Sequence, residues 1–492
     1  MRPFRGPFTI LTALALVAAN SPALSAQQTE GLRSLSAEKR TALDAIDEIE
    51  AQIHTMAMTL WEYSETALLE ARSAEFLAGI LEAEGFEVER GVADMPTAFV
   101  ATFGEGQPRI GVLAEYDALP GVGNAVVPHK APRTDGVTSG QGCGHNLFGA
   151  GSVGAAIALK RTMEREGLAG AVVLYGTPAE ETVVGKAYMA RDGMFDDLDA
   201  ALVWHPGLET EVDNNPGLAM NNFTVEFHGQ AAHSSADPWN GRSALDAVEL
   251  MNHGVNMMRE HIQPSARIHY VIPSAGEAPN VVPEYAKVWY YVRDTARTTV
   301  DEYYDWIRAI AAGSAQATRT EHEVFLITGV HETLLNRPLQ EAMQKNLETV
   351  GPPRFPETFE AFAVEMQRGL DIEEKGLDTE IQPLEPEPEP PTGGSTDVAE
   401  VSYITPTVSL NVTSAPAGVP WHSWATSAAH GTDASVEAAN VAAKVMALTG
   451  VDLLTNPELL RDAQAFFAEK RGGEPYRSPL PAGQKPPLPA DG

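Results

Sequence analysis

The sequence predicts an α/β fold, in which a mixed sheet flanked by helices is interrupted by a smaller α+β domain. Short apolar runs alternate with helical patterns in the first half of the chain, and from about Met220 the pattern changes. The chain has 492 residues, more than one hydrophobic core usually serves, so two domains are expected. Apolar residues make up 43% and charged residues 21%, which is typical of a globular protein.

Three apolar runs predict buried parallel strands in the larger domain. They cover residues 110–114, 172–175 and 201–204, and each is bounded by Gly or Pro. In open α/β sheets, sites form beyond the carboxyl ends of the strands. Side chains that can carry charge or bind metal follow these runs: Glu115 and Asp117, Glu180 and Glu181, and His205.

The smaller domain is predicted at residues 218–330. FTVEFHG, RIHYVIPS, YAKVWYYVRD and EVFLITGV have strand patterns, and helical patterns lie between the first and second and between the third and fourth. The order β-α-β-β-α-β is that of the ferredoxin-like arrangement. We therefore expect a ferredoxin-like α+β domain, inserted between residues 35–217 and 331–455 of the larger domain.

Two proline-rich segments are expected to lack regular structure. PLEPEPEPP lies in a predicted exposed loop at about residues 375–392, because alternating Glu and Pro cannot form a helix or a central strand. Beyond it, TPTVSLNVTS predicts a strand and ASVEAANVAAKVMALTG a helix. Residues 456–492 end in RSPLPAGQKPPLPADG and are expected to form a C-terminal tail.

Residues 1–26 have the pattern of a secretory signal peptide. Arg2 and Arg5 precede a short apolar stretch, and small residues around Ala26 offer a cleavage site. The apolar stretch is shorter than the ~20 residues of a membrane span, so we favour cleavage over an uncleaved anchor. No other segment is expected to cross a membrane. The mature protein is expected to be exported, to the periplasm or beyond.

The net charge bears on which partners the protein can bind, and the cysteine content bears on disulfide formation. The chain has 34 Lys and Arg against 67 Asp and Glu, a formal net charge of −33, which repels nucleic acid and anionic lipid. The single cysteine, Cys143, cannot form an intrachain disulfide. Disulfide formation, the usual role of cysteine in exported proteins, therefore does not explain the presence of Cys143.

Four motifs carry side chains suited to metal binding. CGHN contains Cys143 and His145, whose thiolate and imidazole bind zinc and related ions. GTPAEE ends in Glu180 and Glu181, WHPG contains His205, and VPWHSWATSAAHG offers His422 and His430. Each motif alone has a structural explanation, such as acidic residues at a helix N-terminus. Together they supply more ligands than one metal needs, which favours a two-metal hydrolytic site.

These motifs also carry a family resemblance. The order DALP, GCGHN, GTPAEE, HPG, GQAAHSS, APNVVP and WHSW resembles the aminoacylase and carboxypeptidase family of binuclear metal amidohydrolases. The most similar branch contains auxin-conjugate hydrolases, hippurate hydrolases and aminobenzoyl-glutamate utilization proteins. The resemblance covers about residues 40–480 and is less specific for substrate than for family.

The resemblance implies a role for eight residues, and none of these roles follows from spacing alone. The implied metal ligands are Cys143, His145, Glu181, His205 and His422. Glu180 matches the catalytic glutamate that moves a proton from water to the leaving amine. His233 matches a histidine that reaches the neighbouring subunit's site to stabilise the oxyanion, and Asn280 a polar substrate-binding residue. Many relatives have CGHD, so Asn146 is a departure.

The expected activity is metal-dependent hydrolysis of the amide bond in N-acyl or N-aroyl amino acids, aminobenzoyl-glutamate-like compounds or dipeptides. Two divalent ions per chain are implied, with zinc favoured and manganese as the alternative. A homodimer is implied, with a related second chain as another option. A nucleophilic Cys143 with His145 as base explains neither GTPAEE nor WHPG. A non-catalytic metal-containing binding protein, or one of the two chains of a two-chain hydrolase, is the remaining alternative.

Overall fold

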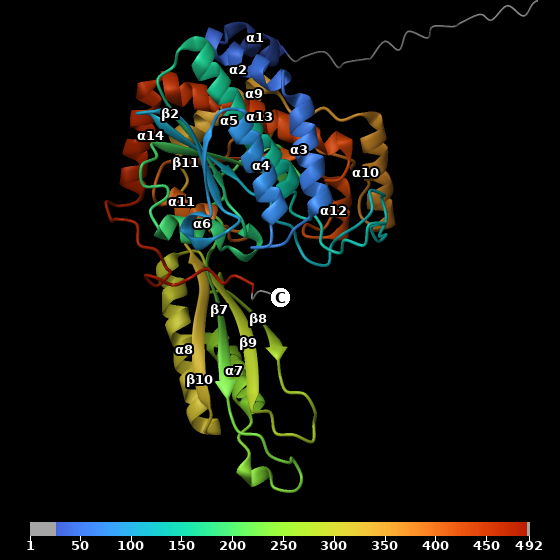
Figure 1. The fold of residues 1–492 in the computed structure, drawn as a ribbon, viewed down its shortest axis with the longest axis vertical. Helices are drawn as coiled ribbons and strands as arrows, with labels where there is room; N and C mark the ends of the chain where they lie inside the picture. The colour runs from blue at the N-terminus through green and yellow to red at the C-terminus, as the bar shows by residue number, and fades with distance from the viewer. Residues whose placement is uncertain (1–25, 490–492) are drawn as a thin grey trace, which may run out of the picture.

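The computed structural model describes residues 26–489, which form a larger unit and a smaller elongated one (Figure 1). The chain enters the smaller unit through β7 and leaves it through β10, then completes the larger unit. The predicted signal peptide, apart from Ala26, lies outside the described residues.

The larger unit contains a seven-stranded mixed sheet in the order β1-β2-β4-β3-β5-β11-β6. The strands β3, β4, β5 and β11 are parallel to their neighbours among these four, and β1, β2 and β6 pair in the antiparallel direction. All three predicted apolar strands are present and parallel, as expected. The strands are β1 (Glu87–Arg90), β2 (Phe99–Glu105), β3 (Arg109–Ala114), β4 (Gly170–Gly176), β5 (Ala200–Gly207), β6 (Glu211–Val212) and β11 (Thr407–Thr413).

Helices cover this sheet, with α5 and α13 packed against each other and against the parallel strands. The helices α2, α3 and α9 pack onto this pair. The helices of the larger unit are α1 (Ala26–Ser34), α2 (Ala37–Asp47), α3 (Glu50–Tyr63), α4 (Ala71–Ala83), α5 (His145–Glu166), α6 (Gly185–Arg191), α9 (Arg337–Val350), α10 (Glu357–Gly369), α11 (Val398–Ser402), α12 (Trp424–Ala429), α13 (Val436–Thr455) and α14 (Pro457–Lys470).

One of these helices is more apolar than expected. Residues Asp433–Thr455, which include α13, are long and apolar enough to span a membrane by length and composition. In the structure 72% of the apolar stretch is buried, against α5, α9 and the sheet. Its hydrophobicity is explained by this position in the core.

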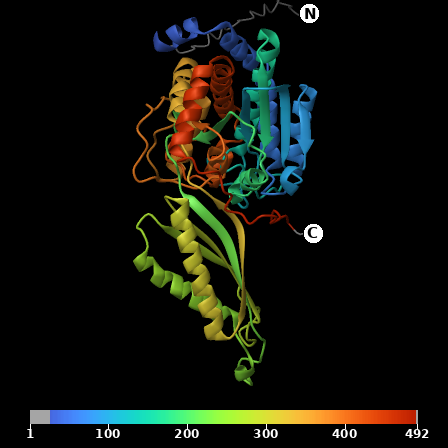
Figure 2. The same cartoon turned by 90° about the vertical axis from the view of Figure 1, so that its left-hand side faces the viewer.

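The smaller unit has the predicted order of strands and helices. It contains β7 (Ala219–His228), α7 (Ala244–Met258), β8 (Arg267–Ser274), β9 (Tyr285–Asp294), α8 (Arg297–Thr318) and β10 (Glu321–Val330). The strands form an antiparallel sheet in the order β10-β7-β9-β8. Both helices lie on one face of this sheet and share a hydrophobic core with it, as Figure 2 shows. Alternate residues of β9 are buried, so its other side chains face away from the helices.

The C-terminal segment differs from the expected tail. Residues 456–492 begin with α14, which Asn456 caps through its side chain and which has Pro457 in its first turn. Ala463 and Phe467 are buried on its inner face. Residues 471–489 contain no helix or strand, and neither does the predicted loop at 375–392.

Candidate metal centre and active site

The predicted site residues of the larger unit meet at the carboxyl ends of its central strands, as parallel α/β sheets favour. Glu180 and Glu181 follow β4, and His205 lies near the end of β5. Cys143 lies in the loop before α5, whose first residue is His145.

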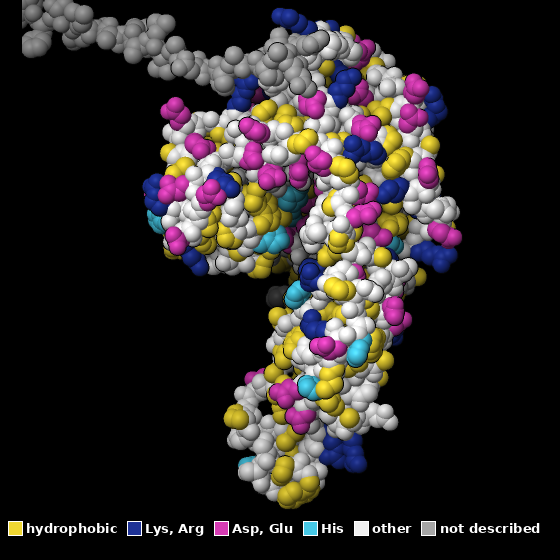
Figure 3. Space-filling view, turned by 180° about the vertical axis from the view of Figure 1, so that it is seen from behind, with side chains coloured by type: hydrophobic (Ala, Val, Ile, Leu, Met, Phe, Trp, Pro, Cys, Tyr) yellow, Lys and Arg dark blue, Asp and Glu magenta, His cyan; other side chains and the backbone are white. Residues whose placement is uncertain are grey.

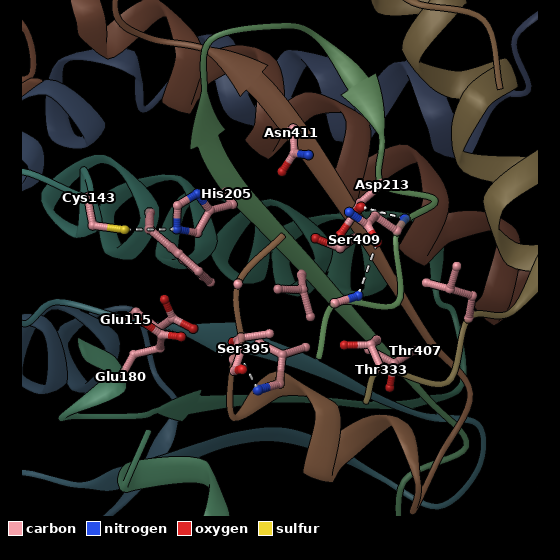
Figure 4. A pocket seen from close by; sticks show the side chains of 18 of the residues that line it. Glu115, Cys143, Glu180, His205, Asp213, Thr333, Ser395, Thr407, Ser409 and Asn411 are labelled. Atoms are coloured by element: carbon pink, nitrogen blue, oxygen red, sulfur yellow. Dashed lines mark hydrogen bonds between the residues drawn. The ribbon is translucent and has the colours of Figure 1, made fainter. Parts of the chain in front are cut away.

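The five predicted ligands form two groups that share one thiol. In the first, the donor atoms of Cys143, His145 and His205 all lie within 4.8 Å of one another. In the second, those of Cys143, Glu181 and His422 do so. The Cys143 Sγ lies 3.3 Å from the Nε2 of His205 (Figure 4). It lies 3.3 Å from the Nε2 of His422 as well. The structure therefore brings together every residue that the resemblance implied as a ligand.

Unusual backbone conformations hold these residues in place. Gly144, between two of the ligands, has φ 86°, and an added Cβ would lie 2.8 Å from Pro206 and 2.9 Å from the ring of His430. His422 has φ 56°, and Ala179, just before Glu180, has φ 58°. Residues other than glycine seldom adopt positive φ, and such strain often occurs at functional sites.

His145 lies between buried carboxylates. Its Nδ1 is 2.9 Å from the Oδ1 of Asp117, and its Nε2 is 3.1 Å from the Oε2 of Glu115 and 3.8 Å from the Oε2 of Glu180. Burial alone would raise the pKa of Asp117, but the adjacent His145 outweighs it and the pKa is lowered. Asp117 also accepts a hydrogen bond from the Glu181 N–H. It thus orients one imidazole and positions a second ligand, a common arrangement behind metal-binding histidines.

Asn146, the departure from the family pattern, has a structural role. Its side chain donates to the carbonyl oxygens of Ala57 and His430, both at 3.1 Å. His430 itself is not in either ligand group. Its ring nitrogens lie 2.8 Å from the Gln141 carbonyl oxygen and 3.0 Å from the Ser414 Oγ, and burial lowers its pKa to about 4. A neutral, hydrogen-bonded His430 supports the loop that carries Cys143.

A buried ion-pair network lies behind the site and was not predicted from the sequence. The Lys186 Nζ lies 2.8 Å from the Oε1 of Glu115 and 2.6 Å from the Oδ1 of Asp397, and all three side chains are buried. Burial would lower the pKa of Lys186, but the two carboxylates outweigh it and raise the pKa. Asp397 lies in the TDVAEVSY segment, whereas nothing in the local sequence marks Lys186 as part of a site.

The donor set fits divalent metal ions. Thiolate, imidazole and carboxylate are the ligands of zinc sites. The buried Oε1 of Glu181 and Nε2 of His145 receive no well-aligned hydrogen bond from the residues that the structure describes. Burial raises the pKa of Glu181 to about 8, and burial with the nearby Glu181 raises the pKa of Cys143 to about 12. A bound cation would favour the charged form of both groups.

The structure does not bring His233 and Asn280 to this site within one chain. Both lie at the free end of the smaller unit, beyond the end of β7, and both are exposed. They are close to each other, because His233 pairs with Val281 and the Ser234 N–H donates to the Asn280 carbonyl oxygen. The His233 Nδ1 accepts from the backbone N–H groups of two following residues.

A cavity of about 390 Å³ opens beside the ligand groups (Figure 4). Cys143, Glu115, Glu180 and His205 line one end of it. Its volume is within the range of small-molecule sites. Glu115, His145 and Glu180 form a third group of donor atoms within 4.8 Å of one another. The geometry thus combines two candidate ligand groups that share Cys143, nearby carboxylates that line the cavity, and room for a small substrate.

Comparisons with known proteins agree with this geometry. Residues 111–449 match peptidase family M20/M25/M40. The chain belongs to this family. It is 36% identical over 469 residues to the B subunit of p-aminobenzoyl-glutamate hydrolase from Escherichia coli, covering 90% of this chain and 97% of the relative. It is 28% identical over 480 residues to the human Xaa-Arg dipeptidase, covering 91% of this chain and 95% of that protein.

The fold is shared with solved members of the family. A Bacillus subtilis protein, described as a dinuclear metal binding peptidase from the M20 family, superposes with a TM-score of 0.55 at 19% identity. The match covers 83% of this chain and 99% of that one. The mixed α/β fold predicted from the sequence is therefore confirmed, and the chain is an amidohydrolase of the M20 type.

Proposed function

We propose that this protein hydrolyses the amide bond between an acyl or aroyl group and an amino acid, with two divalent metal ions and Glu180 as the general base. The observation that carries the proposal is the position of Glu180. Its side chain lines the cavity and lies 3.8 Å from His145, and it is absent from both ligand groups that contain Cys143. With Glu115 and His145 it forms a third group of donor atoms within 4.8 Å of one another, so the metal content of Glu180→Gln distinguishes a base from a ligand.

Cys143 and His145 with His205 would hold one ion, and Cys143 with Glu181 and His422 the other. When bound, such ions polarise an amide carbonyl and activate water. Burial, and then the carboxylates Glu115 and Asp397, raise the pKa of Glu180, which strengthens it as a base. Glu180 accepts the proton of the attacking water and passes it to the leaving amine. Zinc suits this donor set, and manganese is the alternative.

The amino-acid side of the substrate requires a positive partner for its carboxylate. Arg293 on β9 is half-buried and stacks on Tyr291, with its guanidinium carbon 5.2 Å from the ring centre. Its Nε donates to the Met220 Sδ at 3.2 Å, and among the described residues no acidic side chain pairs with its guanidinium. Burial raises the pKa of the Tyr291 hydroxyl, and the charges of Glu180 and Glu181 raise it further. Tyr291 therefore lies near both glutamates. Arg293 therefore supports a substrate with a free carboxylate, such as an N-acyl or N-aroyl glutamate.

A direct role for Cys143 as nucleophile is less well supported. Activated thiols have lowered pKa values, whereas burial raises that of Cys143 to about 12. The ring nitrogens of His145, its suggested base, face Asp117 and Glu115 instead. The remaining alternative is a metal-containing chain without turnover of its own, which works only beside a second, related chain. One relative is named as a single subunit of a hydrolase, which supports this alternative.

We also propose that two copies of the chain associate through the smaller unit. Most of the large hydrophobic side chains that are exposed in the described residues lie there. They are Trp239, Leu250, Met257, Val271, Ile272, Val281, Trp306 and Phe325. Figure 3 shows hydrophobic side chains on the surface of this unit, including its free end. Association would cover this surface and would carry His233 and Asn280 toward a partner's site.

The N-terminal pattern supports export, which N-terminal sequencing of the mature protein tests.

The experiment is a hydrolysis screen with p-aminobenzoyl-glutamate, hippurate, acetylated amino acids and dipeptides, using wild-type protein and two matched variants. Glu180→Gln should keep its metal and lose at least about 100-fold in kcat, because the amide cannot accept the proton. Glu181→Gln, changed at the next position, should bind less metal. Wild-type turnover in Glu180→Gln would place the base elsewhere.

A further inference from the structure

The cavity beside the candidate metal centre continues along β5 and β11, away from the ligand groups (Figure 4). Asn411, Ser409 and Thr407 all line it, because alternate residues of a strand face the same side. Asn411 pairs with His205 at the ligand end. At ~3.3 Å per residue, Thr407 lies about 13 Å farther along the strand. The cavity can therefore hold an acyl group beyond the amide bond that is cut.

Asp213 lines this part of the cavity and is held rigidly. Its N–H donates to the Ser409 carbonyl oxygen at 3.0 Å, and its own carbonyl oxygen accepts from the Gln340 side chain at 2.8 Å. Its Oδ1 accepts from the Asn215 N–H at 3.0 Å. Across residues 26–489, the structure gives its Oδ2 no hydrogen-bond donor. One carboxylate oxygen is thus fixed, and the other has no donor among the described residues.

No lysine or arginine is among the described residues that line the cavity, so nothing there neutralises Asp213. The side chains of Thr333, Thr407 and Ser409 nearby are neutral. Asp213 is half-buried. Removing water from its carboxylate costs free energy unless another hydrogen-bond donor takes the place of the water. A ligand group with N–H donors meets this need, whereas a ligand carboxylate or nitro group would be repelled.

We propose that Asp213 selects substrates whose acyl group carries an amino group, by accepting a hydrogen bond from that amino group in the part of the cavity beside Ser409, beyond the metal ligands. The inference rests on the proposed amide hydrolysis and specifies its acyl side. The amino group can be a neutral arylamine or a cationic alkylamine, because both present N–H groups to the carboxylate. The test distinguishes these two kinds of amino group.

The test compares four glutamate conjugates: p-aminobenzoyl, 4-(aminomethyl)benzoyl, benzoyl and p-nitrobenzoyl. Asp213→Asn keeps an oxygen for the Asn215 N–H and turns an N–H₂ group toward the cavity. It should lower kcat/KM for the amine-bearing substrates by about 10- to 100-fold, the usual effect of losing a hydrogen bond to a charged group. Benzoyl-glutamate should change by less than about threefold, and the nitro compound should improve. A larger loss for the aminomethyl than for the p-amino compound would identify the cationic source, and the reverse the neutral one.

Glu209→Gln is the matched control, because Glu209 is exposed, lies four residues away and does not line the cavity. It should affect all four substrates equally. An equal loss for all four in Asp213→Asn would show a purely structural role and overturn the proposal. If the wild-type protein hydrolyses none of them, the proposed function fails separately. Calorimetry then decides the inference: p-aminobenzoate should bind more tightly than benzoate to the wild-type protein, and equal affinities would overturn it.

Discussion

The two regions that contain the predicted site residues differ in how firmly neighbouring residues hold the site side chains in place. At the carboxyl ends of β3, β4 and β5, the candidate ligands are fixed by neighbours such as Asp117. At the free end of the smaller unit, His233 and Asn280 are exposed and contact mainly their own loops. A single chain thus brings together all the candidate metal ligands, but it does not bring His233 to them. The metal centre should form in an isolated chain, whereas full turnover should require a second chain.

The largest effect is expected from breaking the buried ion pairs behind the metal centre. Lys186→Met leaves Glu115 and Asp397 buried without their cation, which should lower the free energy of unfolding by about 3–5 kcal/mol. Chemical denaturation measures this. Arg308→Met in the smaller unit is the control, because the Arg308–Asp305 pair is exposed and should contribute less than about 1 kcal/mol. Equal effects of the two substitutions would remove the distinction between the two regions.

The next effect concerns the exposed region and turnover. His233→Ala should lower kcat by about 100-fold, as the loss of a transition-state donor does, with metal content unchanged. Mixing it with inactive Glu180→Gln under conditions of subunit exchange should restore part of the activity, because one mixed site has both Glu180 and the partner's donor. No recovery after verified exchange would refute the role across subunits.

The smallest effect is a pH dependence of stability from a buried histidine. Burial lowers the pKa of His430 from 6.5 to about 4, so the unfolded chain binds this proton more readily between these values. The contribution of a neutral His430 is therefore present above about pH 6.5 and is lost as the pH falls toward 4. Between pH 7 and 4.5, wild-type protein should lose about 2 kcal/mol more than His430→Gln. Parallel pH profiles of the unfolding free energy would contradict this.

The sequence predicted the parts of the molecule whose signal is local. The strands before Glu115, Glu180 and His205 are short apolar runs, and the five candidate ligands indicated by the resemblance motifs lie together in the structure. The sequence did not predict the contact between Lys186 and Asp397, which are 211 residues apart. That contact depends on how α6 and α11 pack. The helix α14 was not predicted from the sequence. The proline-rich end of the chain indicated an irregular tail, and the capping residue Asn456 at the start of the helix was not recognised.

The distinction between His422 and His430 could not be drawn from sequence either. Both lie in one polar segment, but only His422 has the left-handed backbone that carries its ring to Cys143. His430 ends α12 and is directed to Gln141 and Ser414 instead. The ring positions follow from the backbone path, which the composition of the segment does not specify.

Metal content per chain tests the central claim, that one thiol is shared by two ligand groups. Elemental analysis of purified protein should give about two divalent ions for the wild type, as in two-metal sites. His205→Ala and His422→Ala each remove a ligand from one group and should keep about one ion, whereas Cys143→Ser should lose most of both. Full occupancy in Cys143→Ser, or equal loss in all three variants, would contradict a shared thiolate.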